Sequence, residues 1–88
     1  MQDFIDDDPG YLAWLAANPS GFVLNSYRQP SRAYLMLHRA TCRSISTLPT
    51  NGSTWTKDCR KICGRREELE SYARSYVGGD LHPCGLCL

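Results

Sequence analysis

Two short pairs of metal-binding residue types lie far apart in the sequence. The first pair is His38 and Cys42, separated by three residues, and the second is Cys84 and Cys87, separated by two. Together they offer one imidazole and three thiolates, a donor set that Zn²⁺ binds with tetrahedral geometry. Two residues between cysteines form a tight turn that presents both thiolates to one ion. The sequence therefore predicts a zinc site made of His38, Cys42, Cys84 and Cys87.

Other histidine and cysteine residues leave alternatives open. His38 could instead be a surface or core histidine, and His82 could be a ligand or donate a hydrogen bond to one. In a strand, Cys59 and Cys63 would lie on one side about 13 Å apart, too far to share an ion. In a helix they could share one. We interpret Cys63 as a small core residue and Cys59 as a partly exposed free thiol.

The length and cysteine count favour a metal over disulfides. A chain of 88 residues makes one domain over residues 1–88 and buries about 60 to 65% of its unfolded surface, so its core is marginal. Five cysteines cannot all pair within the chain. No hydrophobic run approaches the roughly 18 residues of a membrane span, and the N-terminus is acidic where a secretory signal is basic. We expect a cytoplasmic protein with no membrane contact and with Zn²⁺ as its cofactor.

The elements that would carry the first ligand pair are a helix and a β-hairpin. A short helix is expected after Asp8, which can cap it, and Pro9 suits its first position. Residues 22–27 and 33–38 are strand-like runs around a turn that contains proline, so the hairpin leads directly into His38. The expected apolar face of the helix consists of Tyr11, Leu12, Trp14 and Leu15.

The second half of the chain predicts a loop, a third strand and a second helix. Residues 44–56 contain proline, asparagine and glycine and are expected to be mostly loop, anchored by Trp55. A strand over 56–63 would precede a helix over 65–76, which Gly78 would end. We therefore expect a small zinc-stabilised α+β domain: a β-hairpin, a third strand, two helices and a C-terminal zinc knuckle.

The charges are sorted along the chain, although the formal net charge is only +1. Residues 1–8 are acidic and are expected to be a flexible tail, whereas residues 28–66 contain nine basic residues and one acidic residue. This basic region straddles the first ligand pair, and arginine beside tyrosine suits phosphate contact with stacking. The residues expected to contact nucleic acid are Arg28, Arg32, Arg39, Arg43, Lys57, Arg60, Lys61 and Arg65.

The run His38-Arg39-Ala40-Thr41-Cys42, a following amphipathic helix and Gly79-Asp80-Leu81-His82-Pro83-Cys84-Gly85-Leu86-Cys87 resemble the N-terminal zinc domain of Ada-type DNA methylphosphotriester repair proteins. The resemblance covers 34–87, with a longer loop between the motifs in this chain. In that family the first ligand is a thiolate that accepts the methyl group. Here His38 stands in that place, and an imidazole lacks the thiolate nucleophile. The resemblance therefore implies contact with the DNA backbone without methyl transfer.

We expect a non-catalytic zinc module that binds nucleic acid, foremost DNA, as part of a DNA-handling system or an adaptor to one. Four-coordinate zinc has no open position for water, so the chain is not expected to be an enzyme. One alternative is a protein-interaction module that docks through Tyr11 and Trp14 or through the acidic N-terminus. A second alternative is a small metal-dependent nuclease-like domain. Its candidate residues are His38 or His82 with Asp80 or Asn25.

Overall fold

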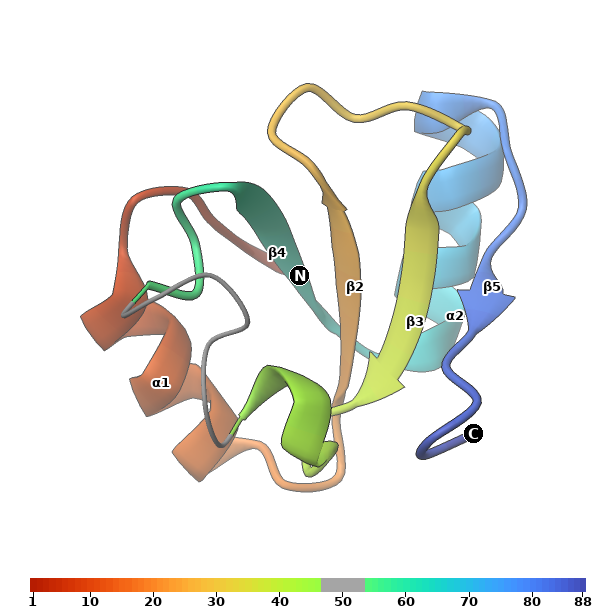
Figure 1. Cartoon of the computed structure of the whole chain (residues 1–88). Helices are drawn as coiled ribbons and strands as arrows, with labels where there is room; N and C mark the ends of the chain where they lie inside the picture. Colours follow the sequence, from red (N-terminus) through yellow and green to blue (C-terminus); the bar gives the residue numbers. More distant parts are fainter. Residues whose placement is uncertain (47–53) are drawn as a thin grey trace.

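A mixed five-stranded sheet forms the middle of the molecule in the computed structural model, which describes residues 1–46 and 54–88 (Figure 1). The strands are β1 (Gln2–Phe4), β2 (Phe22–Tyr27), β3 (Leu35–Arg39), β4 (Cys59–Gly64) and β5 (His82–Pro83). Their order is β1-β4-β2-β3-β5, in which only the β3–β5 pair is parallel. The predicted hairpin (β2–β3) and third strand (β4) are confirmed, and they lie side by side at the centre of the sheet.

Helices cover both faces of this sheet. Helix α1 (Asp8–Ala17) lies on one side, and α2 (Arg66–Ser71), which continues into the π-helical segment η2 (Tyr72–Val77), lies on the other (Figure 1). Neighbouring strand residues point to opposite faces, so the central strands β2 and β4 contribute to both cores. The core on the α1 side contains Phe4, Tyr11, Val23, Cys42, Ile45, Cys63 and Cys84. The core on the α2 side contains Leu24, Leu35, Leu37, Ile62, Leu69 and Ala73.

The first turn of α1 forms hydrogen bonds with residues that precede β4. Asp7, not Asp8 as expected, caps α1, and its carboxylate accepts a hydrogen bond from the Gly10 N–H at 3.0 Å. The Asp8 carboxylate instead accepts from the backbone N–H groups of Trp55 and Thr56 at 2.9 and 2.8 Å. Trp55 packs against the α1-side core, so its predicted anchoring role is confirmed.

Two strands and one helical face differ from the prediction. Residues 1–8 are not a free tail, because β1 pairs with β4 and buries Phe4. Strands β1 and β5 have three and two residues, which is too short to show an alternating pattern. On α1, Tyr11 is fully buried but Leu12 is 42% exposed, so the predicted apolar face is narrower than expected.

The second helix ends where the glycines predicted. Gly78 has a φ of 86°, a left-handed conformation that glycine adopts without steric cost, and its N–H donates to Ala73 O. A short 3₁₀ helix η1 (Arg43–Ile45) begins directly after Cys42 and extends into the expected loop over 44–56, of which residues 47–53 lie outside the described part. Among the described residues, no helix has the length and apolar character needed to cross a membrane.

Candidate metal centre and the surrounding charges

Strand pairing brings the two ligand pairs together. His38 lies near the end of β3, Cys42 follows in the next turn, and Cys84 and Cys87 lie just after β5. The Cys84 N–H donates to Leu37 O at 2.8 Å. This hydrogen bond holds the turn from Cys84 to Cys87, the C-terminal knuckle, against β3. The four ligand atoms all lie within 4.8 Å of one another. This buried group of one histidine and three cysteines could hold a metal ion such as zinc.

The imidazole of His38 fits a metal ligand. Its Nδ1 lies 3.4 Å from Ser44 Oγ, which in turn lies 3.1 Å from Cys42 Sγ. Its Nε2 is buried and, among the described residues, has no hydrogen-bond partner. Burial, helped by the charge of Lys61, lowers the pKa of His38 to about 4, so the ring is neutral at pH 7. A metal ion would give the lone pair of Nε2 the partner that it lacks, while Nδ1–H donates to Ser44.

The thiols of the C-terminal knuckle have opposite tendencies to ionise. Burial raises the pKa of Cys84, but hydrogen bonds from the backbone N–H groups of Leu86 and Cys87 outweigh it, and the net pKa is lowered. Burial raises the pKa of Cys87 to about 11, although the Arg39 N–H donates to its Sγ at 3.3 Å. Three thiolates this close repel one another, and a divalent cation removes that repulsion. The donor set is therefore suited to a bound cation.

The remaining cysteines and His82 lie outside the cluster. Cys59 and Cys63 belong to strand β4, the arrangement in which they cannot share one ion. Cys63 is fully buried, and burial raises its pKa to about 12, so it is a core residue as interpreted. Cys59 is partly exposed, and His82 is exposed on β5.

Replacing His38 tests the ligand assignment directly. We expect His38→Ala to weaken metal binding by more than about 100-fold, because one of four ligands is lost, and His38→Cys to retain the metal. Metal content after dialysis, measured by atomic emission together with thiol titration, checks both. His82→Ala is the matched control and should leave the content unchanged. Full metal content and unchanged folding in His38→Ala would show that His38 is not a ligand.

Four of the eight residues predicted to contact nucleic acid are buried or form ion pairs within the fold. Lys61 is only 4% exposed, because its side chain lies on the face of β4 that points to α1 rather than to solvent. Three arginines form ion pairs with acidic residues. These pairs are Arg28 with Asp6 at 2.8 Å, Arg60 with Asp3 at 3.0 Å and Arg65 with Glu68 at 3.6 Å. The other four predicted residues are exposed and form no ion pair within the described part of the chain. They are Arg32, Arg39, Arg43 and Lys57.

Arg39 is held in place by the candidate metal centre. Its Nε donates to Cys87 O at 3.0 Å, and its guanidinium lies 5.7 Å from the centroid of the Phe22 ring. Arg43 begins η1 immediately after Cys42, so its backbone also adjoins a ligand. Both arginines therefore adjoin the candidate metal centre in the fold.

A second basic region lies at the other end of the hairpin. Arg32 is in the β2–β3 turn, at the end of β3 opposite to Arg39 (Figure 1). The Tyr27 and Tyr34 rings stack beside this turn, with centroids 5.2 Å apart. The basic residues are thus divided between two ends of the domain.

Sequence patterns did not indicate the contacts that two polar residues make near the site. Ser44 contacts both His38 and Cys42, but a lone serine in a loop carries no recognisable signal. Asn25 accepts a hydrogen bond from the buried ammonium of Lys61 at 2.8 Å. The alternation of β4, which places Lys61 on the same face as the buried Cys63, was the available signal for that burial.

Comparison of the chain with protein-family models, with curated protein sequences and with solved structures found no match. The resemblance to the Ada-type domain therefore gains no support from these comparisons. What the chain establishes by itself is a small α+β domain with a buried cluster of one histidine and three cysteines.

Proposed function

We propose that this chain is a non-catalytic, zinc-stabilised module that binds the phosphate backbone of nucleic acid, foremost DNA. The observation that carries the proposal is the placement of Arg39. Its guanidinium is held by Cys87 O and Phe22 and has no carboxylate partner among the described residues. An arginine that is already ordered loses little conformational freedom when it binds a phosphate. Arg43, exposed on the other side of Cys42, supplies a second charge.

The ligand set supports a structural rather than a catalytic metal. One imidazole and three thiolates complete the tetrahedral shell of zinc, which leaves no position for substrate or water. Two of the residues that a nuclease-like site would use are engaged elsewhere: Asp80 pairs with Arg74 at 3.6 Å, and Asn25 bonds to Lys61. These contacts favour binding over hydrolysis.

Salt dependence of binding tests the proposal. Contacts by Arg39 and Arg43 with two phosphates of duplex DNA would give a log–log slope of about −2, and further contacts by Arg32 and Lys57 would bring it to about −3 to −4. We expect the double variant Arg39→Gln/Arg43→Gln to weaken binding and to reduce the slope by about 2. Fluorescence anisotropy with duplex DNA, single-stranded DNA and RNA at several salt concentrations measures both quantities. Because Arg65 and Arg66 pair with Glu68 and Glu70, Arg65→Gln/Arg66→Gln is the matched control, with little expected change.

Absence of binding to all three nucleic acids at low salt would reject this function. The protein-interaction alternative would then apply, but without Tyr11 in the docking surface, because Tyr11 is fully buried. The apolar side chains that favour it are on the second helical segment. Tyr76 is 75% exposed and stacks on Tyr72 with ring centroids 5.1 Å apart. Loss of partner capture in Tyr76→Ser would support this alternative.

A further inference from the structure

A buried ammonium group without a carboxylate partner lies on the α1-facing side of the sheet. Lys61 Nζ donates hydrogen bonds to Asn25 Oδ1 and to Trp55 O, each at 2.8 Å, and lies 6.0 Å from the centroid of the Tyr11 ring. It forms no ion pair within the described part of the chain, and residues 47–53 contain no aspartate or glutamate. The two partners of this cation are therefore neutral, although burying an unpaired charge is costly.

The nearest acidic groups do not neutralise Lys61. The Asp8 carboxylate acts on it only at a distance, because Asp8 is bound to the N–H groups of Trp55 and Thr56 and to Thr56 Oγ1 at 2.7 Å. Asp58 lines the same pocket but is exposed and forms no ion pair with Lys61. A negative charge in the pocket would complete the coordination of this ammonium group.

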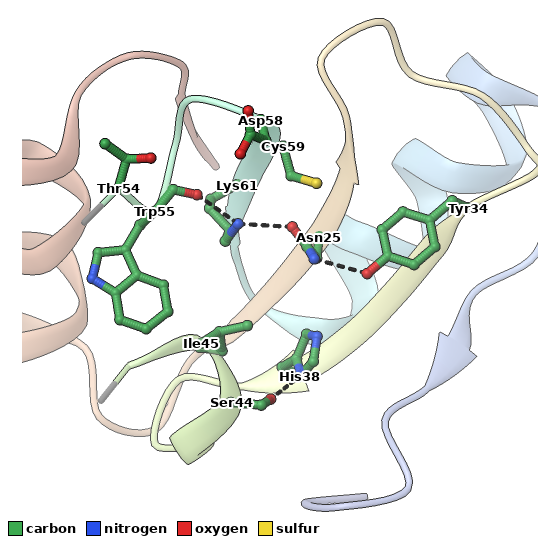
Figure 2. Close-up of a pocket in the computed structure, with 10 residues that line it drawn as sticks. All are labelled: Asn25, Tyr34, His38, Ser44, Ile45, Thr54, Trp55, Asp58, Cys59 and Lys61. Atoms are coloured by element: carbon green, nitrogen blue, oxygen red, sulfur yellow. Dashed lines mark hydrogen bonds between the residues drawn. The ribbon is translucent and has the colours of Figure 1, made fainter. Parts of the chain in front are cut away.

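The ammonium group faces a small pocket of about 180 Å³ (Figure 2). An ammonium has three N–H donors, and the two described bonds use two of them. The Tyr34 hydroxyl accepts a hydrogen bond from Asn25 Nδ2 at 2.8 Å, which leaves its own proton free to donate. Figure 2 shows Lys61, Asn25 and Tyr34 in one row along the pocket. The pocket thus has spare donors where a ligand would need to supply acceptors.

We propose that this pocket binds one small oxyanion, a phosphate or carboxylate group, between the Lys61 ammonium and the Tyr34 hydroxyl. Since a water molecule takes about 30 Å³ in the liquid, the volume admits such a group but not a nucleoside beside it. Asp58 at the rim weakens binding by repulsion. Binding of a small anion in this pocket is a further function beside binding of the nucleic-acid backbone by Arg39 and Arg43, and it does not depend on that binding.

Titration with inorganic phosphate and with acetate tests the pocket. The readouts are the NMR shifts of the Lys61 side chain and of the Asn25 side-chain amide in the metal-loaded protein. We expect saturable shifts at both groups and, for Lys61→Met, binding weaker by roughly 10- to 100-fold, because a charged hydrogen bond is lost. Lys57→Met removes the same charge from an exposed residue nearby and should bind as the wild type does. Shifts of the Asn25 side-chain amide that are equally strong in Lys61→Met would overturn the proposal.

A second variant keeps the test decisive if Lys61→Met fails to fold. Asn25→Asp places a carboxylate where Oδ1 already contacts Nζ, so the chain supplies its own counter-charge. We expect this variant to melt at a higher temperature and to lose phosphate binding. Asp58→Asn should bind phosphate several-fold more tightly. Unchanged phosphate affinity in Asn25→Asp would contradict the proposal.

Oligonucleotides with and without a 5′-phosphate identify the source of the anion. Preference for the phosphorylated strand, lost in Asn25→Asp, assigns a terminal phosphate to the pocket. Equal affinity for both strands, with phosphate binding retained, assigns a free small anion. The variant Arg39→Gln/Arg43→Gln should leave phosphate binding to the pocket unchanged. A loss of binding to the nucleic-acid backbone can therefore be distinguished from a loss of anion binding in the pocket.

Discussion

Addition of a chelator to the metal-loaded domain is expected to abolish its cooperative thermal transition and most of its sheet signal in circular dichroism. Structural zinc contributes about 10 to 16 kcal/mol in small domains, whereas a whole domain is stable by about 5 to 15 kcal/mol. Two of the ligands, Cys42 and Cys84, are also members of the α1-side core. Loss of the ion would therefore leave the buried His38 Nε2 without a partner among the described residues, and the clustered thiols without the cation that binds them.

Cysteine variants separate loss of metal from other effects of the chelator. Cys84→Ser should behave like the chelated protein, because it removes a ligand of the knuckle. Cys59→Ser is the matched control, since Cys59 lies outside the ligand cluster, and it should keep both metal and transition. Restoring Zn²⁺ should restore the transition in the wild type but not in Cys84→Ser. A chelated chain that melts cooperatively at its original temperature would show that the metal does not hold the fold.

Tyr11→Ala should destabilise the metal-loaded domain by about 3 to 5 kcal/mol, the range for removing a large buried aromatic side chain. The ring is fully buried, with centroids 6.1 Å from Phe4 and 6.3 Å from Trp55. Its hydroxyl donates to Ile45 O at 2.6 Å, and Ile45 belongs to η1, directly after the ligand Cys42. Tyr11 therefore joins α1 to the turn that carries a metal ligand, and urea unfolding in saturating metal measures its contribution.

Two further substitutions divide the effect of Tyr11 into its parts. Tyr11→Phe keeps the packing and leaves Ile45 O without its donor, which should cost about 1 to 3 kcal/mol. Leu12→Ala, at the neighbouring exposed position, should change stability by less than about 0.5 kcal/mol. If Tyr11→Ala and Leu12→Ala lowered the free energy of unfolding by equally small amounts, the Tyr11 ring would not support the turn that carries Cys42.

Local patterns were enough to predict the parts of this domain that depend on neighbouring residues. The ligand pairs depend on spacing within a turn, so His38, Cys42, Cys84 and Cys87 could be singled out together. The strands of the hairpin and β4 have five or six residues each, which is long enough to be recognised as strand-like runs, and Gly78 indicates where the second helix ends. Strands β1 and β5 were missed because two or three residues form a strand only when a neighbouring strand supplies hydrogen bonds.

By itself, the sequence determined which residue types could bind metal and that a basic region surrounds the first ligand pair. Only the tertiary structure decided which of those charges face solvent, because ion pairs form between residues that are distant in the chain. Arg60 of β4 is paired with Asp3 of the neighbouring strand β1. The Lys61 side chain points into the fold because side chains alternate between the two faces of β4. Arg39 remains exposed and is held by the same knuckle that contains two of the candidate metal ligands. A charge pattern is local, whereas the availability of a charge depends on the whole fold.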